Sequence, residues 1–477
     1  MSTTLLWLRN DLRLADNPAL HEAVNRGYPV IPVFVWAPDE VGEWAPGAAS
    51  RWWLHHSLAA LKADLVRHGS NLVIRKGASW GALKAMIGQT KATAVFWNRR
   101  YEPAAVARDA KIKEELRTLG IEAKSFNGSL LFEPWEIGNQ SGEPFRVFTP
   151  FWKACLSAPP PGEPLPAPNQ IPSPAEWCCT LDLAKLNLLP TVHWTSGMEA
   201  EWTPGEIGAT RRVCEFVRGA MNFYGRNRDR PDLAGTSRLS PHIHFGEMSP
   251  RQIWHAACEW IANQSIPDAE AYLREIGWRE FAHHLLYYFP QTPVEPMRPE
   301  FSTMPWRRDE DARLSWQRGR TGYPIVDAGM RQLWTTGWMH NRVRMIVASF
   351  LVKDLLIPWQ EGAKWFWDTL VDADLANNTL GWQWTAGCGA DAAPYFRVFN
   401  PILQGVKFDP LGDYVRRWVP ELGSMPPEWI HKPWAAPAGV LNESGVLLGR
   451  TYPHPIVNHD EARKRALAAF AEIRKGR

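Results

Sequence analysis

The first 130 residues alternate short apolar strands with helical segments, and this alternation constrains the fold more than any other feature of the sequence. Buried strands are predicted at residues 4–8, 30–35, 71–75 and 94–97. Asp16-Asn17-Pro18 favours a helix start, and residues 111–119 form a helix that ends at Gly120. Strand–helix alternation of this kind predicts a parallel sheet with helices on both faces. The turn after the first strand reads Arg9-Asn10-Asp11 and lacks a GxGxxG, so this domain is not expected to hold a dinucleotide in the usual manner.

A proline-rich segment separates this domain from a helical remainder. Eight prolines lie between residues 158 and 174, which indicates an extended connector over the surface. Helices are predicted afterwards at residues 210–221, 250–262, 268–288, 324–335, 341–356, 363–370 and 460–475. The predicted fold class is α/β, with a Rossmann-like parallel α/β domain (1–130), a Pro-rich interdomain linker (131–203) and a larger all-helical domain (204–477).

Composition narrows the class of protein. The 477 residues include 27 Trp, more than a core needs, and indole faces suit stacking on flat ligands, although a simple preference for Trp is the alternative. The six cysteines form no CxxC pair, so no metal centre is expected. Neither a signal peptide nor an apolar run long enough to span a bilayer is recognisable. We therefore expect a cytoplasmic protein without membrane association.

Two stretches of the helical half carry unusual polar residues. Residues 307–344 contain eight Arg against four acids, which fits phosphate contacts, with a solvated helix face as the alternative. Residues 371–384 place Asp372, Asp374, two asparagines and two indoles together without a Lys or Arg nearby. Because buried unpaired carboxylates are costly, these acids need either a partner from elsewhere in the chain or a polar ligand. The alternative is an exposed loop.

Helical spacing also groups some polar residues with indoles. Trp338, Asn341 and Met345 stand at i, i+3 and i+7 and so are expected to share one helical face, and Glu275, Trp278, Arg279 and Ala282 are expected to share another. A satisfied buried network is the alternative for each group. Residues 224–240 hold four Arg, and between the third and the fourth lies a Gly-Thr-Ser turn that leads towards a helix, a pattern that can cradle phosphate.

Several long motifs resemble those of the photolyase/cryptochrome flavoproteins, and specifically photolyases of the bacterial type that act on cyclobutane pyrimidine dimers. They are Trp7-Leu8-Arg9-Asn10-Asp11-Leu12-Arg13 with Asp16-Asn17, and the segments 235–240 (GTSRLS), 321–327 (TGYPIVD), 337–344 (GWMHNRVR), 372–384 and 391–401 (DAAPYFRVFNP). The resemblance covers nearly the whole chain. It implies FAD folded into a U in the helical domain.

The resemblance assigns residues to the cofactor. The diphosphate and ribose side would be held by Tyr224, Thr236, Ser237, Arg238, Leu239 and Ser240, with Tyr272 and Trp338 nearby. Asp372, Ala373 and Asp374 would touch the ribityl–isoalloxazine region, with Arg344 as counter-ion of Asp372. Asn378 would face the flavin N5, where an amide favours the reduced anionic flavin because it is no carboxylic acid.

The resemblance also assigns the DNA side and an electron route. Glu275, Trp278, Asn341, Met345 and Trp384 would line the pocket for the flipped dimer, with Glu275, Asn341, Met345 and Asn378 as the catalytic set. DNA-backbone contacts are expected from Arg228, Arg279, Arg342, Arg397, Gln404 and Lys407. Trp382, Trp359 and Trp306 match the family's tryptophan chain, which passes electrons to an oxidised flavin.

The implied activity is that of a deoxyribodipyrimidine photo-lyase, in which excited reduced FAD donates an electron to the flipped-out dimer, the cyclobutane bonds split and the electron returns. The main alternative is a cryptochrome-like photosensor without repair activity. Such receptors usually carry a long tail and often replace the N5-facing amide, whereas this sequence keeps Asn378. Repair of (6-4) photoproducts would need paired histidines where Asn341 and Met345 stand, and a light-independent nucleic-acid binder would not need the tryptophan chain. A monomer is expected.

The sequence departs from the family pattern in the segment that binds the antenna chromophore in many bacterial relatives. Tyr101-Glu102-Pro103 is followed by Ala104-Ala105 in place of the Asn-Glu pair that holds a folate in many bacterial relatives. A pterin sandwiched by Trp36, Trp44, Trp52 and Trp53 is one possibility, and a deazaflavin or an empty site are others. We favour methenyltetrahydrofolate over the deazaflavin.

Overall fold

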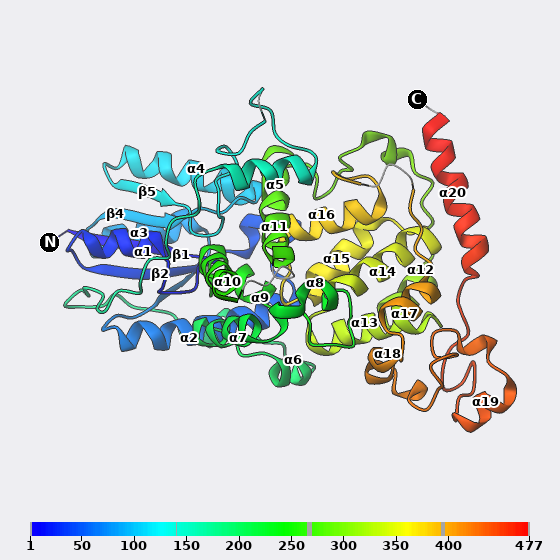
Figure 1. The fold of residues 1–477 in the computed structure, drawn as a ribbon. Helices are drawn as coiled ribbons and strands as arrows, with labels where there is room; N and C mark the ends of the chain where they lie inside the picture. Colours follow the sequence, from blue (N-terminus) through cyan, green and yellow to red (C-terminus); the bar gives the residue numbers. More distant parts are fainter. Residues whose placement is uncertain (1, 140, 265–269, 393–395, 476–477) are drawn as a thin grey trace.

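A five-stranded parallel sheet forms one end of the molecule, and helices form the rest (Figure 1). The computed structural model describes residues 2–139, 141–264, 270–392 and 396–475. The strands are β1 (Thr3–Leu8), β2 (Val30–Trp36), β3 (Val73–Lys76), β4 (Ala92–Asn98) and β5 (Glu122–Phe126), in the order β3-β2-β1-β4-β5. The predicted fold class and the four predicted strands are confirmed. The sequence did not reveal β5, because this half-exposed edge strand (EAKSF) has no apolar run.

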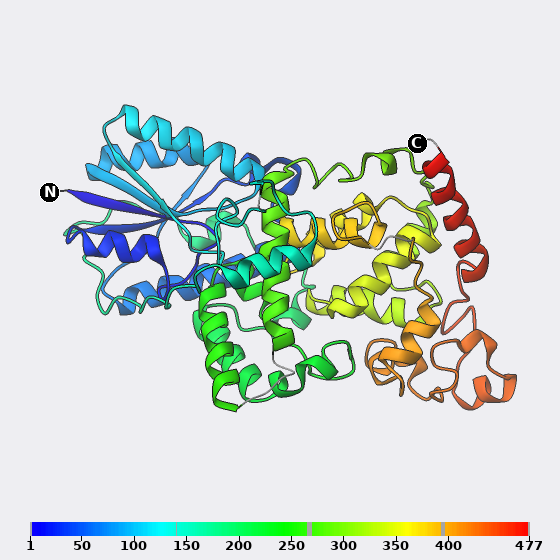
Figure 2. The ribbon, with the colours of Figure 1, turned by 45° about the horizontal axis from the view of Figure 1, so that its top comes forward.

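Helices cover both faces of the sheet (Figure 2). α1 (Pro18–Asn25) and α2 (Ala48–Arg67) pack on one face, where Leu20, Trp52 and Leu58 meet Leu6 and Leu8 of β1. α3 (Ser79–Thr90) and α4 (Pro103–Thr118) cover the opposite face through a second apolar cluster, to which they contribute Leu83, Met86, Ile112 and Leu116. β1 and β2 are buried along their whole length, as strands covered on both faces should be.

The Pro-rich connector at residues 158–174 contains no helix or strand, as expected of an extended segment, and most helices of the helical region follow it. The helices of this region are α5 (Phe148–Ser157), α6 (Ser196–Glu201), α7 (Glu206–Arg218), α8 (Tyr224–Asn227), α9 (Ser240–His244), α10 (Pro250–Gln264), α11 (Glu270–Tyr288), α12 (Glu310–Gln317), α13 (Pro324–Thr336), α14 (Asn341–Ser349), α15 (Trp359–Thr369), α16 (Leu375–Ala386), α17 (Pro401–Phe408), α18 (Asp413–Trp418), α19 (Ala438–Glu443) and α20 (His459–Lys475). α11 runs between the sheet domain and helices α12 to α18 (Figure 1). The predicted helix 341–356 is α14 followed by a π turn at Phe350–Asp354. Positions 268–269 of the predicted helix 268–288 and positions 393–395 of the motif 391–401 lie outside the described residues.

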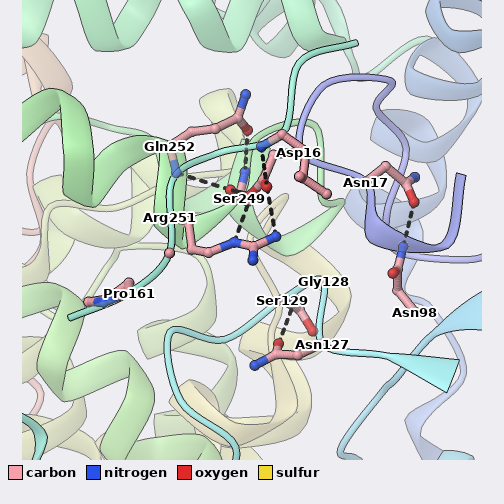
Figure 3. Close-up of polar contacts among 12 residues, drawn as sticks. Asp16, Asn17, Asn98, Asn127, Gly128, Ser129, Pro161, Ser249, Arg251 and Gln252 are labelled. Atoms are coloured by element: carbon pink, nitrogen blue, oxygen red, sulfur yellow. Dashed lines mark hydrogen bonds and ion pairs between the residues drawn. The ribbon is translucent and has the colours of Figure 1, made fainter. Parts of the chain in front are cut away.

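A buried hydrogen-bond network around Asp16 joins the sheet domain to the helical region (Figure 3). The Asp16 carboxylate, fully buried, accepts hydrogen bonds from the Arg251 guanidinium at 2.7 and 3.1 Å and from the Ser249 hydroxyl at 2.5 Å. The Leu165 N–H of the connector donates to the same carboxylate at 3.1 Å. Gly246 sits so close that a Cβ there would lie 2.1 Å from the Asn10 carbonyl oxygen. The two parts of the molecule are therefore fixed against one another at this point.

Candidate functional site

The two acids of the stretch 371–384 precede α16, and each has partners from distant parts of the chain. Asp374 caps α16, because its Oδ1 accepts from the Asn377 N–H at 2.9 Å. Its Oδ2 lies 3.5 Å from His283 Nε2 and 3.8 Å from His244 Nδ1. Although burial opposes ionisation, these two histidines hold the pKa of Asp374 well below its usual value. The loop is thus a built site and not an exposed connection.

Asp372 is paired with an arginine from α14. Arg344 Nη2 donates to both carboxylate oxygens, at 3.1 and 2.8 Å, and the Asp372 side chain is only 3% exposed. The same guanidinium donates through Nε to the Met339 carbonyl at 2.8 Å, which fixes its plane. The structure therefore contains the Arg344–Asp372 ion pair that the resemblance implied.

The residues expected at the diphosphate side gather next to this pair. Trp338 Nε1 lies 3.3 Å from the Ser240 hydroxyl oxygen, and the Arg344 guanidinium is 5.9 Å from the Trp338 ring centre. The Arg238 guanidinium lies between the Trp202 and Trp338 rings, 4.6 Å from each, and pairs with Glu201. A connected set of side chains thus runs from Ser240 to Asp372.

Tyr272 and Tyr224 contact one another next to Ser237. The Tyr272 hydroxyl bonds to Ser237, and burial raises the pKa of Tyr272 above its usual value. The Tyr224 ring contacts Tyr272 with a centroid distance of 5.2 Å. Leu239 is buried in the apolar cluster beneath them.

Polar atoms without partners test whether this region fits a cofactor. Arg238 Nε, His340 Nε2 and Trp382 Nε1 are buried and have no hydrogen-bond partner among the described residues. Orphaned buried donors are costly in a folded protein. Of these three residues, Arg238 was expected at the diphosphate side and Trp382 in the electron route, whereas His340 had no expected role. Hydroxyls, an arginine and paired carboxylates form a donor and acceptor set that suits a diphosphate, a ribityl chain and the edge of a flavin. The residues present fit FAD.

One expected helical face is wrong. α14 begins at Asn341, and His340 caps it by accepting the Arg342 N–H at 3.2 Å. Trp338 therefore precedes the helix and does not share a face with Asn341 and Met345. Asn341 is exposed in the first turn of α14, and Met345 is half-buried one turn later.

The residues expected around a flipped dimer occupy α11, α14 and α16. Glu275 pairs with Arg228 Nη1 at 2.5 Å; burial raises the pKa of Glu275, and Arg228 only partly opposes this. Trp278 stacks on Phe148 with ring centres 3.8 Å apart, so one of its faces is already covered. Trp384 Nε1 donates to the Asp391 carbonyl at 3.1 Å.

Arg279, expected at DNA, has other partners in this structure. It donates to the Ser129 carbonyl at 2.7 Å, lies 3.3 Å from Glu280 and is 14% exposed. Arg279 also lines the cleft between the two parts of the molecule.

The tryptophans of the expected electron route belong to one core cluster. Trp382 and Trp359 are each 2% exposed, and Trp306 packs against the cluster from its edge. α15 and α16 approach closely at Gly362, where a Cβ would lie 2.0 Å from the Trp382 ring. Trp382 also contacts Phe366 and Trp316, with ring centres 5.0 and 6.3 Å apart. These two neighbours were missed because nothing in their local sequence distinguishes them from core aromatics.

The expected DNA-backbone residues lie on neighbouring segments. Arg342 is 4.6 Å from the Phe408 ring centre of α17, the helix that also carries Gln404 and Lys407. Arg228 and Arg342 both approach Asp229, an acid that the sequence did not single out. Arg397 is exposed beside the cleft that Trp384 lines.

An open cleft lies between the sheet and the helical region. Residues following β1 and β4 line it, together with His244, Arg279, His283 and Asp374. The sheet order changes direction between β1 and β4, the place where open α/β sheets bind ligands. The stacked tryptophan site considered for a pterin is wrong, because Trp52 and Trp53 are 2% and 0% exposed in the core under α2.

Comparisons with known proteins agree with this architecture. Residues 4–169 match the family described as DNA photolyase, and residues 272–472 match the FAD binding domain of DNA photolyase. The chain belongs to the photolyase/cryptochrome family of flavoproteins. It is 49% identical over 472 residues to a deoxyribodipyrimidine photo-lyase of Agrobacterium fabrum, covering 99% of this chain and 98% of that protein.

Two further relatives are similar to almost the whole of this chain. The crystal structure of a bacterial class III photolyase from Agrobacterium tumefaciens superposes with a TM-score of 0.97 at 49% identity, covering 100% of this chain and 98% of the other. Cryptochrome-1 of Arabidopsis thaliana is 42% identical over 98% of this chain and 70% of that protein. The expected enzyme class, deoxyribodipyrimidine photo-lyase, is confirmed by these comparisons. Within the described residues, no helix has the length and apolar character to cross a membrane.

Proposed function

We propose that the protein repairs cyclobutane pyrimidine dimers in DNA with light, using FAD bound in the helical region. The observation that carries this proposal is that residues of three expected roles lie on one helix, α16. This helix carries Asn378, the buried Trp382 and the indole of Trp384, and Asp372, paired with Arg344, lies in the turn that leads into it. The cofactor side, the electron route and the pocket for the lesion are therefore joined by a single rigid element.

The bound cofactor, when reduced, supplies the light-driven electron for the reaction. Arg344 holds the Asp372 carboxylate in place, and Asn378, whose Nδ2 donates to the Ala363 carbonyl at 3.1 Å, presents an amide that does not release a proton. Glu275 would bind the polar edge of the flipped dimer, while Trp278, Trp384, Asn341 and Met345 would bind its rings. Flipping costs least for a base pair that the lesion has already distorted, which favours damaged DNA.

The test is a repair assay with illuminated and dark samples. Pre-reduced protein is mixed with ultraviolet-damaged oligothymidylate, and thymine is measured after illumination. We expect thymine to be restored in the light and not in the dark, and Glu275→Gln to lower the yield per photon while FAD content is unchanged. Protein that holds FAD but restores no thymine in the light would refute the proposal.

A photosensor without repair activity is the second candidate, favoured by the 42% identity to a plant cryptochrome. Such a protein would bind FAD and reduce it in the light through Trp382, yet leave dimers intact. The same assay separates the two functions, because photoreduction and thymine recovery are measured on one sample.

For the antenna chromophore we propose methenyltetrahydrofolate over a deazaflavin. The arginines and histidines of the cleft at the carboxyl ends of β1 and β4 suit a ligand with carboxylates. Acid extraction and absorption spectroscopy of purified protein identify the chromophore. Recovery of a deazaflavin would contradict this assignment.

A further inference from the structure

Asp229 lies between two arginines that are expected to contact the DNA backbone. Its Oδ1 is 2.8 Å from Arg342 Nη2 and 3.3 Å from Arg342 Nε, and Arg228 Nε lies 4.0 Å from the same oxygen. The three side chains are 37%, 18% and 28% exposed respectively, so this group is accessible from outside. Two cations that would attract phosphate thus share one acid.

Each arginine is held by a second contact as well. Arg228 Nη1 pairs with Glu275 at 2.5 Å, and its guanidinium is 5.7 Å from the Tyr224 ring centre. Arg342 lies 4.6 Å from the Phe408 ring centre. A guanidinium fixed by an acid on one side and an aromatic ring on another has lost most of its rotamer freedom before any ligand binds.

We propose that Asp229 is a specificity-determining residue that suppresses binding to undamaged DNA. This inference rests on the proposed function, since it needs Arg228 and Arg342 to meet the phosphates that flank a flipped dimer. Free arginines attract any phosphate, and this attraction supplies most non-specific affinity. Asp229 offsets that attraction at both arginines and holds the Arg342 guanidinium directly, while Glu275 holds that of Arg228.

The gain in discrimination follows from what each kind of DNA requires. A straight undamaged duplex must turn the arginines toward its own phosphates, which breaks their pairing with Asp229. A backbone bent around a flipped dimer meets them where they already point, and insertion of the lesion beside Glu275 adds contacts that undamaged DNA lacks. Asp229 therefore weakens the binding of undamaged DNA more than the binding of dimer-containing DNA.

The test is Asp229→Asn, which removes the charge and keeps the shape. Binding of the FAD-loaded protein to undamaged and to single-dimer oligonucleotides is measured by fluorescence anisotropy over a series of salt concentrations. We expect the Kd for undamaged DNA to fall about three- to fivefold, with a salt dependence steeper by about one phosphate contact. The Kd for dimer DNA should change by less than about twofold.

The matched control is Glu310→Gln, which removes the same charge from an exposed pair with Arg313 on α12. It should alter neither Kd. Asp229→Ser is a second charge-removing variant with the same expectations, used if Asp229→Asn proves unstable. Equal tightening of both DNAs, weakening of both, or no change in either would overturn the inference.

Failure of this inference is distinguishable from failure of the proposed function. Wild-type protein that restores no thymine in the light refutes the repair activity. Wild-type protein that repairs dimers while Asp229→Asn discriminates as well as it does refutes the role of Asp229 alone.

Discussion

Asp16 at the sheet domain and Asp372 in the helical region are both acids bonded to an arginine, but they differ in what surrounds them. Asp16 has a complete set of protein donors from Arg251, Ser249 and the Leu165 N–H. The Asp372 carboxylate is bonded to the Arg344 guanidinium, which lies near Trp338 and, through it, near Arg238, whose buried Nε has no partner among the described residues. The motif at Asp16-Asn17 therefore builds a joint between two parts of the molecule, whereas the motif at 372–384 builds a site.

The largest effect is expected at the joint. Asp16→Ala leaves Arg251 and Ser249 without their acceptor, and losing one partner of a buried pair costs about 3–5 kcal/mol in the free energy of unfolding. Urea unfolding measures this loss, and FAD absorbance per folded molecule should be unchanged because the site lies elsewhere. If Asp16→Ala kept wild-type stability but lost its FAD, Asp16 would belong to the cofactor site and not to the contact between the two parts of the molecule.

Acid should weaken the helical region through two buried histidines. Burial lowers the pKa of His284 and of His340 to about 4. The unfolded chain, with histidine pKa values of about 6.5, binds more protons between these limits, so stability falls as pH drops from 6.5 towards 4. Each histidine accounts for about 2 kcal/mol at pH 5.

The measurement is urea unfolding at pH 7 and pH 5. The double variant His284→Gln, His340→Gln should lose less stability than wild type between the two values. An identical loss in both proteins would show that other groups control the acid response.

An intermediate effect is expected at the site acid. Asp372→Asn removes the charge that faces Arg344, and truncating such a pair typically costs about 2 kcal/mol, equivalent to about 30-fold weaker binding of FAD. Titration of apoprotein with FAD, followed by flavin fluorescence, gives the Kd. An unchanged Kd for FAD would show that Asp372 does not contribute to the cofactor site.

The smallest effect on stability is expected inside the shared core. Trp382→Phe leaves a small cavity against Gly362 and costs about 1–2 kcal/mol. Photoreduction of oxidised FAD should slow about tenfold or more, as expected when the proximal donor is lost, and repair by chemically pre-reduced protein should fall much less. Flash photolysis and the thymine assay measure the two rates, and a parallel fall in both would mean that the indole holds the pocket and does not conduct electrons.

Local pattern predicted the central strands and most helices because burial and periodicity are local properties. β5 escaped because an edge strand that is half exposed carries no apolar run. Trp338 was placed on a helix because spacing alone cannot show that His340 caps α14. The burial of Trp52 and Trp53 depends on residues such as Trp202 and Phe245, far along the chain, so no sequence window contains it.

The site was predicted less completely than the fold. Resemblance supplied Arg344 as the partner of Asp372, a contact across 28 positions that composition alone did not reveal. Asp229 and Trp316 were missed, because an acid among arginines and a tryptophan among core residues look ordinary until the chain is folded. Long-range pairing is a property of the fold and not of the neighbouring residues.

A crystal structure of the FAD-loaded protein tests the central claim most directly, namely that the helical region and not the sheet edge holds the catalytic cofactor. We expect the isoalloxazine beside Asn378, within contact of Asp372 and Trp382. A catalytic FAD in the cleft after β1 and β4, with packed side chains filling the space next to Asn378, would contradict the account.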